Sequence, residues 1–386
     1  MSMRGREIDG GLRGDDLIRE LERANLLGRG GAGFPVGRKW RTVKANGNGR
    51  AVVLANGAEG EPLSRKDRTL MVERPHLVID GALLAAEAVR ATDIVFYVGG
   101  EHTAAVSAMR RALAERPERA VRRARLVEAP AGYISGEESA AVHYLNAGDA
   151  RPTMTPPRPF ERGVDGRATL VQNIESLAMA ARIAAGEQSG TALFTAGGSV
   201  RRGGVYELPI GAAPADVADA AGGLTREVQA VLVGGYFGSW APVDEVWSLT
   251  LNPSSLRARG LAFGCGVVYF LSAESCGVDA TARIMSYLAG QSARQCGPCV
   301  FGLGAIASAM RRLAERTPQA DDLARVTRWS GLLAGRGACK HPDGATGLLR
   351  SALDVFADDF VAHQHRRCIT KRAVPDHSRV LAEAVA

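Results

Sequence analysis

The sequence predicts an α/β protein that begins with a doubly wound parallel sheet and continues into a small mixed β module and a C-terminal helical bundle. Over residues 1–188, short apolar runs alternate with helical patterns, which is typical of a parallel sheet covered by helices. Residues 189–272 change to short strands separated by turns, and residues 273–386 are mostly helical. A chain of 386 residues is long enough for these three domains.

The first domain is predicted from the order of its apolar runs. Continuous apolar runs bounded by polar loops indicate buried strands, and apolar residues every three to four positions indicate amphipathic helices. The predicted strands are 51–56, 93–100 and 124–129, and the predicted helices are 15–27, 76–90, 102–116, 136–145 and 169–186.

The other two domains are separated from the first by a change of pattern. A proline-rich stretch, 151–160, is predicted to be an ordered loop or a junction. The strands of the β module are expected within 192–200, 204–211, 228–236 and 266–271, and the helices of the bundle at 278–289, 297–315, 320–334 and 345–362.

The charge balance narrows the possible partners. The formal net charge is +7, but the arginines are scattered and only 5% of residues are aromatic, which argues against nucleic-acid binding. The longest apolar run, 260–271, is too short to span a bilayer, and the N-terminus has no apolar signal core. We therefore expect a cytoplasmic protein, able to dock on a membrane partner. The arginines expected on solvated helix faces include Arg110, Arg111, Arg119, Arg122, Arg123, Arg311 and Arg312.

The strongest chemical signal is the run Cys296-Gly-Pro-Cys299, followed by Cys339. Two thiolates in C-x-x-C can reach one metal, because the intervening turn brings their sulfurs together. The spacing fits an iron–sulphur cluster or a Cys3His zinc site. A buried reduced pair without metal and a thioredoxin-like redox pair are the alternatives. Candidates for a fourth ligand are His341, Cys276 and Cys265.

Three polar loops are candidate ligand sites. The glycines of residues 28–33 allow close approach of a phosphate or a planar ring, and Lys39 follows them closely. The loop 56–62 follows a strand end, where open α/β sheets bind ligands. The loop 131–139 opens a helix whose N-terminal amides suit an anion or a ring carbonyl. Its acids, Glu137 and Glu138, also suit the first turn of a helix without any ligand.

Together these segments resemble the NADH-binding flavoprotein subunit of respiratory complex I and its relatives in soluble hydrogenases and formate dehydrogenases. Six matching segments occur in family order and cover nearly the whole chain. They are GRGGAGFPVGRKW (28–40), NGAEGEP with KDR (56–68), GYISGEES (132–139), TLVQNIES (169–176), the CGPC pair, and Cys339 with DGA (343–345).

The resemblance implies an FMN-binding α/β domain, a β-grasp module of the soluble-ligand-binding type and a helical bundle that carries a [4Fe-4S] cluster. It implies cluster ligation by Cys296, Cys299 and Cys339, and a nicotinamide-side role for Phe34, Glu61 and Glu138, the two glutamates as catalytic residues. The FMN contacts that it implies are Gly28, Gly30, Gly31, Gly33, Lys39, Asn56, Tyr133, Gly136, Glu137 and Asn173.

The sequence departs from the family at four informative positions. The family has an Asp where this chain has Ala58, and an aromatic residue where it has Thr42. The family's K-P-P-F segment corresponds to Thr155-Pro-Pro-Arg158. The first of three consecutive cluster cysteines corresponds to Ala293, so the cluster is either [4Fe-4S] with another fourth ligand or [3Fe-4S]. The nucleotide contacts are altered together, which predicts weak use of NAD(P)H.

The resulting hypothesis is an electron-transfer flavoprotein subunit that relays electrons between FMN and the cluster. Its expected partners are a ferredoxin-like or other redox protein, or a membrane cytochrome complex, within a hetero-complex. The alternatives are a genuine NAD(P)H:acceptor oxidoreductase subunit and a non-catalytic scaffold that binds zinc or another small ligand.

Overall fold

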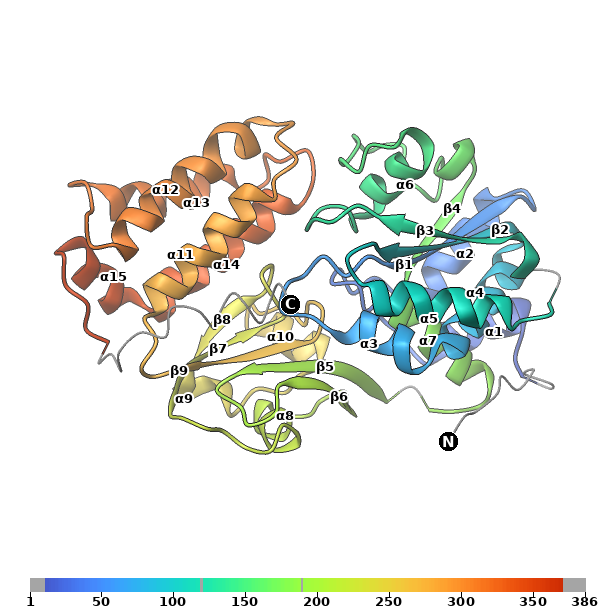
Figure 1. Cartoon of the computed structure of the whole chain (residues 1–386), viewed down its shortest axis with the longest axis horizontal. Helices are drawn as coiled ribbons and strands as arrows, with labels where there is room; N and C mark the ends of the chain where they lie inside the picture. The colour runs from blue at the N-terminus through green and yellow to red at the C-terminus, as the bar shows by residue number, and fades with distance from the viewer. Residues whose placement is uncertain (1–10, 119–120, 189, 371–386) are drawn as a thin grey trace. The chain divides into compact units, whose positions relative to one another are not determined.

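The computed structural model describes residues 11–118, 121–188 and 190–370. The chain divides into two compact units, one formed by Met1–Gly60 with Arg65–Thr191 and the other by Glu61–Ser64 with Ala192–Ala386 (Figure 1). The ends of the first and third predicted domains, 1–10 and 371–386, lie outside the described residues. The boundary between the β module and the helical bundle stays a prediction.

The first unit is built on a four-stranded parallel sheet in the order β3-β2-β1-β4. Side chains alternate between the faces of β1: Val53 and Ala55 join the larger apolar cluster, whereas Val52 and Leu54 join a smaller one with residues of α6. Helices therefore cover both faces, and the predicted α/β class is confirmed. The strands are β1 Ala51–Gly57, β2 Ala91–Gly99, β3 Ala124–Ala129 and β4 Thr169–Asn173, and α6 is Glu138–Ala147.

The helix predicted over 169–186 is wrong at its start. Residues 169–173 form β4, which pairs with β1 from Val52 opposite Thr169 to Asn56 opposite Asn173. The apolar run of this segment fits a buried strand or a helix equally well, and only the pairing with β1 decides between them. The helix itself, α7, begins at Ile174.

The remaining helices of this unit follow the predictions with two additions. The helix predicted over 15–27 ends at Arg23, and the helices α2 and α3 are not predicted. The helices are α1 Gly14–Arg23, α2 Val36–Asn46, α3 Lys66–Glu73, α4 Pro75–Val89, α5 Thr103–Ala114 and α7 Ile174–Ala184, with 3-10 turns at Val121–Arg123 and Val164–Gly166.

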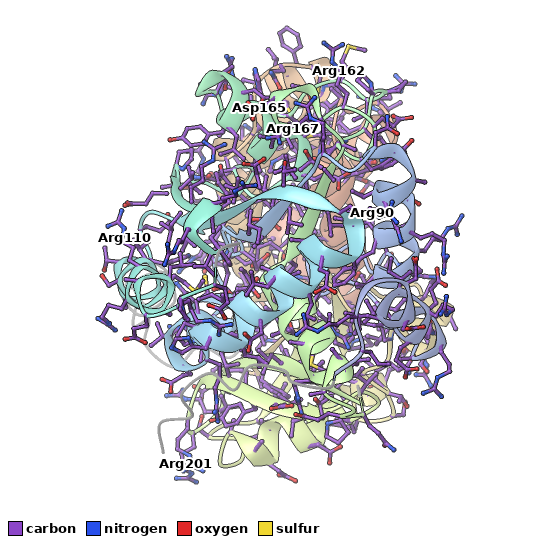
Figure 2. All side chains as sticks on the ribbon, turned by 90° about the vertical axis from the view of Figure 1, so that its right-hand side faces the viewer. Arg90, Arg110, Arg162, Asp165, Arg167 and Arg201 are labelled. Atoms are coloured by element: carbon purple, nitrogen blue, oxygen red, sulfur yellow. The ribbon has the colours of Figure 1, made fainter. Side chains whose placement is uncertain are left out.

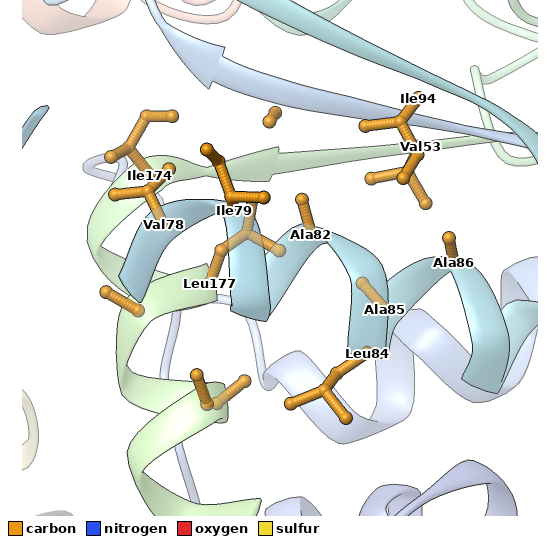
Figure 3. Packing of buried hydrophobic residues seen from close by; sticks show 14 of the residues in the cluster. Val53, Val78, Ile79, Ala82, Leu84, Ala85, Ala86, Ile94, Ile174 and Leu177 are labelled. Atoms are coloured by element: carbon orange, nitrogen blue, oxygen red, sulfur yellow. The ribbon is translucent and has the colours of Figure 1, made fainter. Parts of the chain in front are cut away.

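Helix α4 packs against the sheet and against α7, and Figure 3 shows Ile79 and Ala82 of α4 with Leu177 of α7. The helices approach closely at Gly81, where an added Cβ would lie 2.0 Å from the carbonyl oxygen of Leu177. Only glycine fits there, so this packing depends on the absence of a side chain. This packing fixes the position of α7. It thereby also fixes the junction where β4 ends and α7 begins.

The second unit contains a mixed five-stranded sheet in the order β6-β5-β9-β7-β8. Strand β9 pairs parallel with β5 and antiparallel with β7, and β7 pairs antiparallel with β8. Strand β8 and three short helices are not predicted from the sequence. The elements are β5 Thr191–Gly198, β6 Gly204–Pro209, β7 Val228–Val233, β8 Ser239–Pro242, β9 Val267–Ser272, α8 Pro214–Ala220, α9 Val243–Val246 and α10 Pro253–Ala258.

Helices follow the sheet in this unit. The single helix predicted over 345–362 is wrong, because two helices, α14 and α15, meet at Phe356, whose ring packs on Trp240 at a centroid distance of 5.4 Å. The helices are α11 Gly277–Gly290, α12 Leu303–Ala314, α13 Asp322–Leu333, α14 His341–Val355 and α15 Ala357–Gln364, with a π turn at Pro298–Gly302. Among the described residues, no helix is long and apolar enough to cross a membrane.

The described arginines expected on helix faces are mostly exposed, and two of them, Arg110 and Arg312, form ion pairs. Figure 2 labels Arg110, which pairs with Glu128. It also labels Arg167 beside Asp165, with 3.0 Å between the charged atoms. Such exposed pairs contribute little to stability, about 0–1 kcal/mol each. Arg119 lies outside the described residues.

Candidate functional site

The carboxyl ends of all four parallel strands meet at one edge of the first sheet. Asn56 on β1 and Asn173 on β4 are direct register partners at this edge. Open α/β sheets bind ligands outside the carboxyl ends of their strands, because loops and helix N-termini gather there. The structure thus brings together two of the predicted FMN contacts that lie far apart in the sequence.

Asn173 connects three parts of this edge. Its Oδ1 accepts from the amides of Glu175 and Ser176 and so caps α7, while its Nδ2 donates to Asp67 Oδ2 at 2.7 Å. An added Cβ on Gly30 would lie 3.2 Å from the Asn173 Cβ, so the glycine-rich loop lies directly on this residue.

The glycine-rich loop leaves room for a ligand. Gly31 and Gly33 have φ values of +101° and +64°, which favour glycine, and an added Cβ at either would meet nothing within 4 Å. The amide of Arg29 donates to Ser176 Oγ at 2.9 Å and fixes the loop on α7. Phe34, at the end of the loop, is 47% exposed. The backbone of the loop is therefore fixed on α7 and has open space beside it. A flavin or phosphate site requires both features.

The loops after β1 and β3 pack against each other. Asn56 Nδ2 donates to the carbonyl oxygen of Gly136 at 2.8 Å, and an added Cβ on Gly136 would lie 3.2 Å from that of Ala58. An added Cβ on Gly60 would lie 2.9 Å from the carbonyl oxygen of Tyr133. The position where the family has an Asp is thus a buried alanine against Gly136.

Helix α6 begins at this edge with two glutamates. Glu137 caps the helix by accepting from the amides of Ser139 and Ala140. Burial raises the pKa of Glu137 above its ordinary value, although these donors oppose the shift. Glu138 Oε2 pairs with Lys39 Nζ at 3.1 Å, so the predicted cation and the predicted catalytic acid neutralise each other.

A network of buried charged side chains lies next to this edge of the sheet. The sequence alone does not predict it. Lys66 Nζ lies 2.7 Å from Asp67 Oδ1 and 3.0 Å from Glu175 Oε2, and Arg29 Nε lies 3.8 Å from Glu175 Oε1. Glu59 accepts from the amides of Asp67 and Arg68 at 2.9 Å. The KDR run at 66–68 marks the position of Lys66 in the sequence, but it does not indicate that Glu175 and Arg29 join the network.

The charges of this network depend on one another. Burial lowers the pKa of Lys66, but the carboxylates of Asp67, Glu175 and Glu59 outweigh it and hold the pKa above its ordinary value. Burial and the neighbouring Asp67 raise the pKa of Glu59. Lys66 is 2% exposed, so it depends on these carboxylates for its charge.

Glu61, the other predicted catalytic residue, belongs to the second unit. Its Oε2 accepts from the amide of Tyr236 at 2.8 Å, beside Gly235. This contact fixes the 61–64 segment on the turn after β7. A nicotinamide-side role for Glu61 stays a prediction.

The C-G-P-C segment forms a tight turn that opens a helix. The amide of Cys299 donates to the carbonyl oxygen of Cys296 at 3.0 Å, and the π turn Pro298–Gly302 leads into α12. Burial raises the pKa of the Cys296 thiol, but the amides of Ala338 and Cys299 donate to its sulfur and bring the pKa below its ordinary value. Amide donors of this kind stabilise a metal-bound thiolate.

Two of the three predicted cluster cysteines, Cys296 and Cys339, act electrostatically on the third, Cys299. Burial, and then the neighbouring Cys296 and Cys339, raise the pKa of Cys299 to about 12. Ionisation of either neighbour therefore opposes ionisation of Cys299, and a bound cation would relieve this repulsion. The donor set therefore fits a cysteine-bound metal cluster.

The fourth-ligand candidates lie in different places. His341 is buried, its Nε2 donates to the carbonyl oxygen of Leu288 at 2.7 Å, and burial lowers its pKa. Cys265 lies in the turn before β9, and its Sγ donates to the carbonyl oxygen of Gly234, which follows β7. Cys276 precedes α11 and contacts His363, whereas Cys296 follows the other end of this 14-residue helix. Ala293 precedes Arg294, which has a positive φ of 52°.

Comparisons with known proteins match both halves of the chain. Residues 21–182 match the family model of the Nuo51 FMN-binding domain, and residues 279–363 match that of the NADH-ubiquinone oxidoreductase-F iron-sulfur binding region. The chain is 31% identical over 380 residues to the NADH-quinone oxidoreductase subunit named F 2 in Rhizobium meliloti (strain 1021), covering 92% of this chain and 90% of the relative. It is 29% identical to the NADH-quinone oxidoreductase subunit named F in Escherichia coli (strain K12), covering 91% and 85%.

A solved structure has the same fold over most of the chain. It is an NAD+-reducing [NiFe]-hydrogenase in the H2-reduced state, with a TM-score of 0.82 and 27% identity over 90% of this chain. The match covers 62% of the solved chain, so this protein spans about three fifths of its length.

Proposed function

Because the chain belongs to the family of the NADH-quinone oxidoreductase subunits named F, we propose that it relays electrons between FMN and an iron–sulphur cluster as a subunit of a larger complex. The observation that carries this proposal is the edge of the first sheet, where Asn56, Asn173 and the open glycine-rich loop meet. Bound FMN would supply two-electron chemistry with a donor and one-electron chemistry with the cluster.

Different residues of this edge would make different contacts with FMN. Gly31 and Gly33 let backbone approach the ligand, because no side chain fills the space beside them. Lys39 and Glu138 form a paired charge at the start of α6, which offers a donor to an electron-rich ring or a phosphate oxygen. Asn56 is held by Gly136, so it presents a fixed amide at the strand end.

The cluster would be held by Cys296, Cys299 and Cys339. A hydrogen bond between the thiols of Cys296 and Cys299 supports these two ligands, and the amides directed at Cys296 favour its thiolate form. A fourth ligand other than cysteine, or a [3Fe-4S] cluster, follows from Ala293 at the family's first cysteine position. This ligand set stays a proposal.

The proposal is tested by the visible spectrum of anaerobically purified protein, with flavin, iron and zinc quantified in the same sample. We expect flavin bands, a broad thiolate-to-iron absorption and close to one FMN per chain. A colourless protein without iron would contradict the proposal. It would favour the scaffold alternative instead.

We further propose that the flavin exchanges electrons with a protein partner more readily than with NADH. Thr42 offers no ring for stacking on an adenine, and its hydroxyl donates back to the carbonyl oxygen of Arg38 within α2. Phe34 remains exposed, with the Arg38 guanidinium 5.9 Å from its ring centroid. Arg158 is exposed where the family has an aromatic residue. A base gains about 1–3 kcal/mol from aromatic stacking, so the loss of a ring weakens binding substantially.

The second candidate function is that of an NAD(P)H:acceptor oxidoreductase subunit. One substitution, Thr42→Tyr, tests between it and the first. We expect NADH to bleach the flavin of the wild-type protein slowly and incompletely under anaerobic conditions. Thr42→Tyr should lower the NADH concentration needed for half reduction by about tenfold, because a ring restores the stacking partner. Thr42→Leu is the matched control, since it adds apolar area without a π face. Prompt stoichiometric bleaching of the wild type would instead favour the NAD(P)H function.

The protein works within a hetero-complex, as its subunit-named relatives indicate. We propose that its redox partner is a ferredoxin-like protein or a membrane cytochrome complex. We also propose that it is cytoplasmic and reaches a membrane only through such a partner.

A further inference from the structure

A second set of metal-binding side chains lies in the helical bundle, away from the C-G-P-C turn. Cys276, His363 and Cys368 place one ligand atom each within 4.8 Å of the other two. Cys276 Sγ lies 3.3 Å from His363 Nε2. We call these three residues the Cys2His cluster. Neither the proposed function nor the family resemblance uses it as a unit.

The imidazole of His363 is oriented as a metal ligand. Its Nδ1 lies 2.8 Å from the carbonyl oxygen of Leu313 on α12. A carbonyl oxygen only accepts, so Nδ1 carries the proton and the Nε2 of the neutral ring keeps its lone pair. That lone pair faces the Cys276 sulfur, and the residue is 1% exposed. A carbonyl that orients a histidine from behind is a common feature of metal sites.

Cys276 is equally well placed to bind a cation. It is the N-cap of α11, and its sulfur accepts from the amide of Asp279 at 3.5 Å. Burial raises the pKa of the Cys276 thiol, the amide of Asp279 opposes this shift, and the carboxylate of Asp359 adds to it, so a bound cation would be what holds the sulfur as a thiolate. Asp359, buried on α15 one turn before His363, adds a carboxylate to the same face of that helix.

The spacing fits a tetrahedral ion. Zinc binds sulfur at about 2.3 Å and nitrogen at about 2.0–2.1 Å, which places a bound sulfur and nitrogen about 3.6 Å apart. The separation of 3.3 Å between Cys276 and His363 is close to this value. Two thiolates and one imidazole are a typical zinc donor set, and an oxygen ligand completes four-coordination.

We propose that Cys276, His363 and Cys368 bind a structural zinc ion. The ion would join the start of α11 to α15 and to the segment that follows it. This site is distinct from the proposed iron–sulphur site, because the 14 residues of α11 separate Cys276 from the C-G-P-C segment. At 1.5 Å per residue the helix is about 21 Å long.

The test is zinc content per chain, measured by plasma mass spectrometry on full-length protein purified anaerobically from zinc-supplemented medium. We expect close to one zinc in the wild type, and at least a tenfold loss in Cys276→Ser, His363→Gln and Cys368→Ser. The matched control is His365→Gln, an exposed histidine two residues from His363 that should keep its zinc. FMN and iron should be unchanged in all four variants, so the result is independent of the flavin and cluster proposals.

A second measurement does not depend on the folding of any variant. Zinc K-edge X-ray absorption of the wild-type protein should show two sulfur and one imidazole scatterers, and neither iron nor flavin interferes at this edge. Absence of zinc from the wild type, zinc retained in all three variants, or a sulfur-free zinc environment would each overturn the proposal. A Cys276–Cys368 disulfide found by mass spectrometry of the anaerobic protein would overturn it as well.

Discussion

Cys296→Ala is expected to yield a protein that keeps its flavin and loses its cluster iron. Cys296 is half-buried at the start of the C-G-P-C turn, so removal of its sulfur should leave the fold intact. Two cysteines then remain of the three proposed ligands. Even outer-shell changes at metal sites cost about 10–100-fold in affinity, so the iron content should fall at least about tenfold.

The measurement is iron and FMN per chain on anaerobically purified protein, together with the electron paramagnetic resonance signal of the reduced sample. Cys276→Ser is the matched comparison, because it removes a cysteine sulfur at the other end of α11. We expect a double dissociation: Cys296→Ala loses iron and keeps zinc, whereas Cys276→Ser loses zinc and keeps iron. Unchanged iron in Cys296→Ala would remove this residue from the ligand set.

The second large effect is expected from Glu175→Ala in the buried ion network. Glu175 lies 3.0 Å from Lys66 Nζ, and both side chains are almost fully buried. Removal of Glu175 leaves the buried charges of Lys66 and Arg29 less well compensated, and breaking a buried ion pair costs about 3–5 kcal/mol. The free energy of unfolding should therefore fall by about this amount. Because Arg29 also contacts Glu175, the glycine-rich loop should loosen and release FMN more easily.

Urea unfolding followed by circular dichroism measures the stability change, and ultrafiltration measures FMN retention. The control is Glu187→Ala, whose carboxylate pairs with Arg182 near the other end of α7 and is 52% exposed. We expect that change to stay within about 1 kcal/mol, because exposed ion pairs contribute little. A loss below about 1 kcal/mol in Glu175→Ala would show that the network does not hold this edge.

Much of the fold follows from local patterns. Strands β1, β2 and β3 are found within two residues of their predicted ranges, since each is a continuous apolar run between polar loops. Helices α4, α5 and α11 also follow their predicted ranges closely. The segment 169–173 is the informative failure, because its residues suit a strand or a helix and the pairing with β1 decides.

The candidate site also has some features that local sequence predicts and others that depend on distant segments. Glycine spacing and the C-x-x-C turn act over a few residues, so the sequence predicts a flavin loop and a cysteine-bound metal. The buried partners of Lys66 could not be predicted, because Glu175 returns to it only through the pairing of β4 with β1. The sequence also offers Cys276 as a cluster ligand, with no indication of its contact with His363.

By itself, the sequence determined the family and the α/β class, and it predicted the residue types expected to meet the flavin and the cluster. Those features depend on neighbours along the chain, where periodicity and spacing act directly. Only the tertiary structure decided that Asn56 and Asn173 stand side by side, that Glu175 neutralises Lys66, and that Cys276 faces His363 from 87 residues away. Each of these depends on where distant segments return in space, and desolvation makes the resulting contacts strong once they form.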